Sequence, residues 1–66
     1  MREWLIRIRG KEKLTQKDVG RLCNISPAYY CMIEKGTRNP TVKLAKSIAK
    51  KMNFSLYAKD WTSFFN

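Results

Sequence analysis

Apolar residues recur at helical spacing in several short stretches of the chain, and polar residues separate these stretches. The most regular stretch lies between residues 41 and 52. Its apolar positions follow one another at intervals of three and four, and they are Leu44, Ala45, Ile48, Ala49 and Met52. Thr41 can cap such a helix at its start, and Asn53 marks its end. The spacing therefore predicts an amphipathic helix whose other face, with Lys43, Lys46, Lys50 and Lys51, is solvated.

The first stretch, residues 2–9, predicts another helix. Its inward positions are Trp4, Leu5 and Ile8, and its surface positions are Arg2, Glu3 and Arg7. Alternation of charged and apolar residues also fits a strand, but a lone strand would have nothing to pair with. We expect Gly10 to end this helix.

Residues 15–35 predict two further short helices. Thr15 can accept a backbone hydrogen bond at the start of the first, and Asp18 stands at the offset of a capping box. The inward stripe of this helix consists of Val19, Leu22 and Cys23. Gly20 is unfavourable in a helix by about 1 kcal/mol relative to alanine, so we expect another helix to approach closely there.

The joint between these two helices has the residues of a tight turn. Asn24 tolerates the left-handed conformation, Ser26 is a good N-cap, and Pro27 suits the first helical position. We expect Tyr30 and Ile33 to point inward. Residues 15–40 thus have the sequence form of a helix-turn-helix.

The C-terminal stretch predicts a fifth helical segment, which Asp60 either continues or breaks in two. Ser55 can cap it, and aromatic residues follow at helical spacing, namely Tyr57, Trp61, Phe64 and Phe65. The last three either close the small core or form a dimer interface, where such residues are enriched. The expected fold is all-α: a compact bundle of about five short helices in a single domain, residues 1–66.

The charge of the chain indicates a polyanionic partner. Fourteen Lys and Arg residues against five Asp and Glu give a formal net charge of +9 over 66 residues. Nucleic acid and an anionic membrane surface both fit such a charge. No apolar run approaches the roughly 20 residues of a membrane span, and the first residues lack the features of a secretory signal. We therefore expect a cytoplasmic protein with no membrane partner.

The residues needed for catalysis are largely absent. There is no histidine, the five acidic residues are scattered, and no glycine-rich loop is present to hold phosphate. Cys23 and Cys31 are too far apart for a paired metal ligand, and they are the only cysteines. We predict two free thiols, no enzyme activity, no metal, no cofactor and no small-molecule ligand.

The run from Leu14 to Tyr57 resembles the lambda-repressor-like (Cro/repressor, XRE-type) helix-turn-helix regulators. Four motifs occur in the expected order: LTQ opens the second helix, Ile-Ser opens the third, IEKG closes it, and RNP precedes the fourth. Asn24 replaces the usual turn glycine, and Cys23 replaces the usual apolar residue. The resemblance implies a sequence-specific regulator of transcription, a repressor that binds double-stranded DNA at a palindromic operator as a homodimer.

The resemblance also implies roles for individual residues. The third helix would enter the major groove and present four residues to the bases: Pro27, Ala28, Tyr29 and Met32. The residues that would meet the phosphates are Gln16, Lys35, Thr37 and Arg38. Arg9 and Glu34 would form a structural pair. The base-facing set is unusual, since many relatives carry Gln, Arg, Ser or Asn there to read base edges.

Two alternatives remain at these positions. Tyr29 and Met32 also fit an exposed apolar patch that binds a protein, which would make the chain an adaptor of the antitoxin or antirepressor type. Gln16 also fits an ordinary surface residue of its helix, although its place at a helix start favours phosphate.

Overall fold

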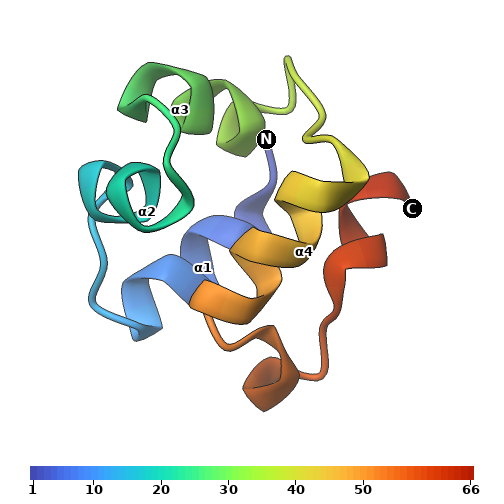
Figure 1. The fold of residues 1–66 in the computed structure, drawn as a ribbon. Coiled ribbons are helices and arrows are strands. Elements are labelled where there is room, and N and C mark those ends of the chain that lie inside the picture. The colour runs from blue at the N-terminus through green and yellow to red at the C-terminus, as the bar shows by residue number, and fades with distance from the viewer.

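The computed structural model describes all 66 residues and contains helices but no strand (Figure 1). Four α-helices are followed by two short 3₁₀ turns. Their bounds are α1 Glu3–Lys11, α2 Gln16–Cys23, α3 Pro27–Lys35, α4 Val42–Lys51, η1 Phe54–Tyr57 and η2 Trp61–Phe65. The all-α prediction is confirmed, but the number of helices is four and not five. No helix has the length and apolarity that a membrane span requires.

One hydrophobic core lies between the helices, and every element contributes to it. Its buried residues are Leu5, Ile8, Val19, Tyr30, Ile33, Ala45, Ile48, Met52, Phe54 and Phe64. The periodicity of α4 is confirmed, because Ala45, Ile48 and Met52 are all fully buried. Burial of this apolar surface is the main source of stability in so small a domain.

The predicted caps begin three of the four helices. Thr15, Ser26 and Thr41 each accept a hydrogen bond from the backbone amide three residues later, at 3.0, 3.1 and 3.1 Å. Asp18 also accepts from the amide of Thr15 at 2.9 Å, which completes the capping box. These contacts satisfy amides that have no partner within the helix, so helix starts follow directly from local sequence.

The prediction that Gly10 ends the first helix is wrong. The helix runs on to Lys11, and the amide of Glu12 still donates to the carbonyl of Ile8 at 2.9 Å. One glycine weakens a helix by only about 1 kcal/mol, which the packing of Leu5 and Ile8 outweighs. The chain reverses instead at Lys13, which has a φ of 57°.

The C-terminal stretch is two 3₁₀ turns and not one helix. Ala58 has a φ of 57°, which interrupts the helical path. Asp60 then opens the second turn by accepting from the amide of Thr62 at 2.9 Å. Of the aromatic residues, Phe64 is buried and closes the core, while Phe65 is 45% exposed. The core-closing interpretation is therefore correct for Phe64.

One apolar side chain of α2 differs from the expected pattern in exposure. Leu22 is 45% exposed and does not join the inward stripe, whereas Val19 is fully buried. Cys23 and Cys31 are both free and half-buried, as predicted. A helix of eight residues that packs on two sides has too narrow a buried stripe to include every apolar position.

Candidate nucleic-acid interface

The turn between α2 and α3 brings the two helices into close contact at Gly20. A Cβ atom at this position would lie 2.8 Å from the carbonyl oxygen of Ile25 and 3.3 Å from the nitrogen of Pro27. Asn24 has left-handed angles, φ 59° and ψ 42°, and the amide of Ile25 donates to the carbonyl of Gly20 at 2.8 Å. The left-handed conformation of Asn24 is confirmed, and the groups that approach Gly20 are the carbonyl of Ile25 in the turn and Pro27, the first residue of α3.

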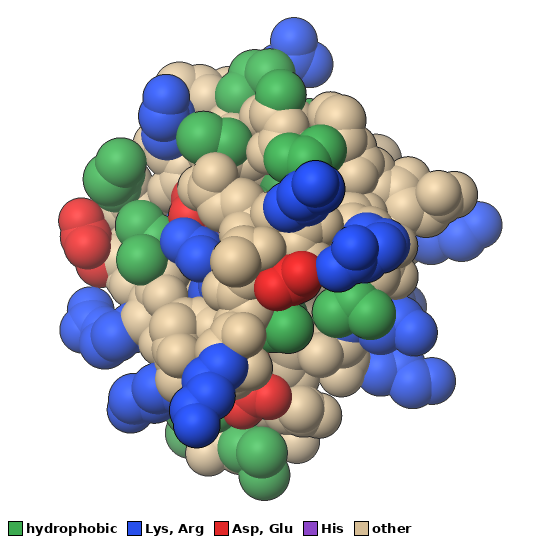
Figure 2. Space-filling model, turned by 90° about the vertical axis from the view of Figure 1, so that its left-hand side faces the viewer, with side chains coloured by type: hydrophobic (Ala, Val, Ile, Leu, Met, Phe, Trp, Pro, Cys, Tyr) green, Lys and Arg blue, Asp and Glu red, His purple; other side chains and the backbone are tan.

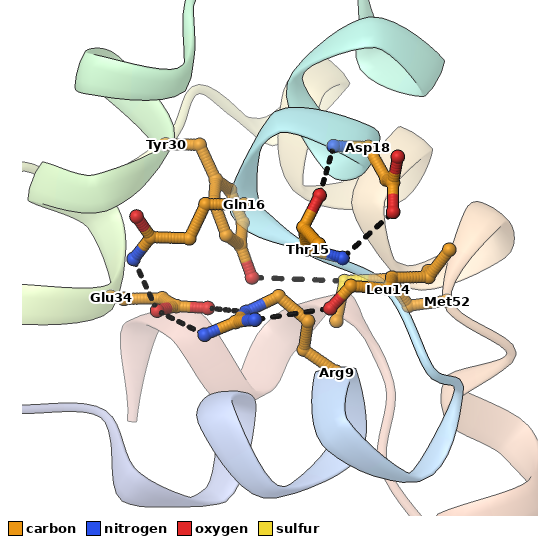
Figure 3. Close-up of polar contacts among 8 residues, drawn as sticks. All are labelled: Arg9, Leu14, Thr15, Gln16, Asp18, Tyr30, Glu34 and Met52. Carbon is orange, nitrogen blue, oxygen red and sulfur yellow. Dashed lines mark hydrogen bonds and ion pairs between the residues drawn. The ribbon is translucent and has the colours of Figure 1, made fainter.

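A buried carboxylate joins α1, α2 and α3 (Figure 3). Arg9 donates to Glu34 from Nε to Oε2 at 2.5 Å and from a terminal nitrogen to Oε1 at 3.3 Å. Its other terminal nitrogen donates to the carbonyl of Leu14 at 3.0 Å. Gln16 donates from Nε2 to Oε1 of Glu34 at 2.9 Å. The structural pair implied by the resemblance is therefore present. Together with Gln16 it fixes the orientation of α1, α2 and α3 relative to one another.

The environment of this network shifts the pKa values of Glu34, Arg9 and Tyr30. Burial acts to raise the pKa of Glu34, but hydrogen bonds from Arg9 and Gln16 outweigh it and hold the pKa below its usual value. The hydrogen bond with Glu34 raises the pKa of Arg9. Burial raises the pKa of Tyr30 strongly, and its hydroxyl lies 3.9 Å from the sulfur of Met52. Glu34 is thus a charged structural group at neutral pH.

Gln16 is the first residue of α2, and its side chain is half-buried. The contact with Glu34 holds its amide against α3. The sequence pattern does not predict this contact, because the residues are 18 positions apart and belong to different helices. Gln16 nevertheless stands at a helix N-terminus, the kind of place where phosphate binds in proteins.

The first turn of α3 presents most of its predicted base-facing residues to solvent. Pro27 and Ala28 are exposed, and Met32 is 36% exposed. Tyr29 differs from the expectation, since it is half-buried and packs against the hydrophobic core. The exposed residues of α3 before Lys35 are therefore apolar, with Tyr29 at the edge of this surface.

A basic loop continues from the C-terminus of α3. Gly36 closes the helix with a φ of 83°, and the amide and hydroxyl of Thr37 donate to the carbonyl of Met32 at 3.1 and 3.2 Å. Lys35 and Arg38 flank these residues, and both are exposed. The loop is thus folded against α3, which brings the predicted phosphate-facing residues beside the apolar surface.

Arg2 holds this loop in place by hydrogen bonds to Arg38 and Asn39, a role that the sequence pattern does not predict. One terminal nitrogen donates to the carbonyls of Ile33 at 2.5 Å and Arg38 at 3.2 Å. The other donates to Oδ1 of Asn39 and to the carbonyl of Phe64, the latter at 3.2 Å. Burial lowers the pKa of Arg2, although arginine remains charged. The sequence pattern places Arg2 on the surface of the first helix, but Arg2 precedes α1, so helical spacing does not set the direction of its side chain.

Most of the positive charge has no acidic partner within the chain. The ion pairs are those of Arg9 with Glu34 and of Arg21 with Asp18. Figure 2 shows the face on the side of α2, where Lys and Arg side chains are spread widely among apolar patches and a few acidic groups. A positive potential therefore extends over this face and attracts polyanions without defining one narrow site.

Comparisons with known proteins agree with this geometry. A family model described as helix-turn-helix matches residues 5–58. The chain is also similar to YqaF of Bacillus subtilis (strain 168), named an uncharacterized HTH-type transcriptional regulator. The two are 45% identical over 65 residues, which cover 98% of this chain and 79% of that protein. No solved structure matches the chain.

Proposed function

The chain belongs to the helix-turn-helix family, and we propose that it is a sequence-specific DNA-binding regulator of transcription. In this proposal it acts as a cytoplasmic repressor, with no catalytic step. It binds a palindromic operator as a homodimer and places α3 in the major groove. The observation that carries the proposal is the exposed first turn of α3 beside the basic loop, with both fixed to the core by Arg2 and Glu34.

The bases are read mainly through shape and apolar contact in this proposal. Ala28 and Met32 have no hydrogen-bonding side chain, but they can contact the methyl groups of thymine. Tyr29 supplies the one hydroxyl among the four predicted base-facing residues. Discrimination at other positions comes from the deformability and groove width of the DNA. Preferred operators are therefore expected to contain thymines where α3 lies.

The phosphates supply most of the affinity. Lys35, Thr37 and Arg38 meet one strand from the loop after α3, and Gln16 meets a phosphate at the start of α2. Each neutralised phosphate releases counterions, so binding weakens steeply as salt rises. The unpaired charge elsewhere on the molecule draws DNA toward this face from a distance.

The homodimer brings two copies of α3 to one side of the DNA. Their centres lie about 34 Å apart, one helical turn, in this arrangement. Phe65 is 45% exposed and packs against Trp61 with ring centroids 6.2 Å apart. This aromatic surface is a suitable part of the contact between protomers, because Trp and Phe are enriched at interfaces.

The test selects DNA from a random pool and then measures binding to the selected duplex and to scrambled duplexes at several salt concentrations. The proposal expects affinity for the selected duplex at least about 1,000-fold above that for scrambled DNA. Sedimentation of the protein with that duplex gives the stoichiometry, which is expected to be two chains per site. Equal affinity for selected and scrambled DNA would contradict sequence-specific recognition.

A second candidate function is a protein-binding adaptor on the same fold. The apolar surface formed by Pro27, Ala28 and Met32 favours it, because exposed apolar patches often mark protein contacts. The two candidates are separated by Met32→Glu and Arg38→Ala. A stoichiometric protein partner that is lost with the first variant and retained with the second, in a chain that binds no DNA selectively, would favour the adaptor.

A further inference from the structure

A hollow of about 310 Å³ lies between α1 and the segment around η1. Figure 1 shows α3 and η1 at opposite ends of the molecule, so this hollow is remote from the helix proposed to read DNA. Six residues line it: Trp4, Arg7, Ile8, Lys11, Tyr57 and Lys59. Trp4, Ile8 and Tyr57 belong to the hydrophobic core or pack against it, whereas the three basic residues do not.

The apolar part of the hollow is fixed by the fold. Trp4 and Ile8 are one helical turn apart on α1, so their side chains share one face. Trp4 is held edge-on against Phe54, with ring centroids 5.6 Å apart. The hydroxyl of Tyr57 donates to the carboxylate of Glu12, which fixes the ring on the other side. A small molecule therefore meets preformed aromatic walls.

Three basic side chains surround these walls. Arg7 and Lys11 are one turn apart on α1, and Lys59 follows η1. The ammonium of Lys59 lies 5.3 Å from the centre of the Trp4 ring, and that of Lys11 lies 5.7 Å from the Tyr57 ring. Such contacts hold each charge beside a wall of the hollow. None of the three cations forms an ion pair within the chain.

The carboxylate of Glu12 forms no ion pair with these three cations. Glu12 is outside the lining of the hollow, and it accepts hydrogen bonds from Tyr57 and from Nδ2 of Asn53, the latter at 2.8 Å. These bonds lower its pKa, so Glu12 is ionised at neutral pH without an ion pair to any of the three cations. Three cations thus face a concave aromatic surface that contains no acidic lining residue.

We propose that this hollow is a binding site for a small organic anion with a planar apolar part, such as an aromatic carboxylate or an aryl phosphate. The anionic group lies among Arg7, Lys11 and Lys59, and the planar part lies against Trp4, Ile8 and Tyr57. The volume is at the lower end of the range for small-molecule sites, about 300–1,000 Å³. The site differs from the sequence-based expectation of no small-molecule ligand and does not depend on DNA binding.

The test titrates the whole isotope-labelled chain with 2-naphthoate and follows backbone and indole amide signals by NMR. Saturable shifts are expected at residues 4, 7, 8, 11, 57 and 59. Arg7→Ala and Lys59→Ala should each weaken binding about two- to fivefold, as expected for an exposed charge. The matched control is Lys50→Ala, which removes an exposed lysine on α4 and should leave the affinity unchanged.

Two further probes separate the contributions of charge and shape. The neutral 2-naphthamide is expected to bind more weakly than 2-naphthoate, and inorganic phosphate is expected to bind more weakly still. Thermal unfolding of each variant verifies that its fold is intact. The proposal is overturned by shifts that do not saturate, by shifts spread over the lysines of α4, or by equal binding of the neutral probe. Affinity unchanged in both Arg7→Ala and Lys59→Ala would also overturn it.

Discussion

Arg9 and Glu34 are 25 residues apart in sequence, yet the guanidinium of the first donates to both carboxylate oxygens of the second. The side chain of Glu34 is only 3% exposed. The pair connects α1 to α3, and Gln16 adds α2 through the same carboxylate. The position of α3 relative to the rest of the domain therefore depends on one buried charge.

Arg9→Ala should destabilise the fold by about 3 kcal/mol at neutral pH, because it leaves a buried carboxylate without its main partner. Chemical unfolding measures this loss. Arg7→Ala is the matched control, since Arg7 is an exposed arginine of the same helix without an ion pair. A similar loss in both variants would mean that the pair contributes nothing specific.

The loss of stability in Arg9→Ala should depend on pH. In the native protein the pKa of Glu34 lies below its ordinary value of 4.5, so its contribution is present above that value and disappears as the pH falls through the lowered pKa. Without Arg9, burial dominates and raises the pKa, so the unfavourable charge is relieved on acidification. The stability difference between native protein and variant should therefore begin to shrink above pH 4.5, where Glu34 of the variant takes up a proton, and continue to shrink until the pH falls below the lowered pKa of the native protein. A difference independent of pH would contradict this account.

Gly20→Ala should destabilise the domain by about 1–2 kcal/mol, the usual effect of overpacking, despite the higher helix propensity of alanine. The reason is the contact of 2.8 Å between the added Cβ and a backbone oxygen, which cannot rotate away. Gly10→Ala is the control, because nothing lies within 4 Å of its added Cβ. That substitution should stabilise the fold by about 0.5–1 kcal/mol. Thermal melts of the two variants should thus shift in opposite directions.

Arg2→Ala should loosen the loop after α3 and the C-terminal turn together. The variant loses the contacts to Ile33, Arg38, Asn39 and Phe64, and we expect a loss of about 2 kcal/mol. Amide hydrogen exchange should accelerate at residues 37–39 and near Phe64, while α2 keeps its protection. Uniform acceleration throughout the chain would indicate global destabilisation instead of a local clamp.

Arg38→Ala should weaken binding to selected and scrambled DNA about equally, and it should reduce the slope of log affinity against log salt by roughly one unit. Its side chain is exposed, so the fold should be unaffected. Lys17→Ala, an exposed cation on α2, is a matched charge control. A slope identical to that of the native protein would remove Arg38 from the phosphate contacts.

Ala58→Gly should stabilise the chain by up to about 1 kcal/mol. Ala58 has a φ of 57°, and the left-handed conformation is unfavourable for alanine by about 1–2 kcal/mol. Part of the gain is lost because glycine has more freedom in the unfolded state. A lower melting temperature in the variant would contradict this expectation. It would show that packing of the Ala58 methyl group stabilises the fold by more than its left-handed conformation destabilises it.

Features that depend on neighbouring residues were predicted well from the sequence. The caps at Thr15, Ser26 and Thr41 need only a hydroxyl and an amide three residues away, and the left-handed Asn24 needs only a tolerant side chain. The family resemblance extended this success to the Arg9–Glu34 pair, which spacing alone does not predict.

Features decided by tertiary packing were predicted poorly. The apolar spacing after Met52 looked like a helix, but Phe54 and Phe64 bury their rings at 5.8 Å from each other only if the chain turns twice. Arg2 was assigned to the surface because its partners lie 31 to 62 residues away. The exposure of Leu22 and the inward packing of Tyr29 likewise depend on where adjacent helices lie.

The contacts of Arg2 also determine where additional chain can be attached. Because Arg2 binds the carbonyls of Phe64 and of Arg38 in the loop, the residues at both ends of the chain lie near that loop. A purification tag or fluorescent label fused to either terminus would crowd the loop expected to meet DNA. A label at an internal surface position remote from it, such as Lys13 in the α1–α2 turn, would report on binding without obstructing it.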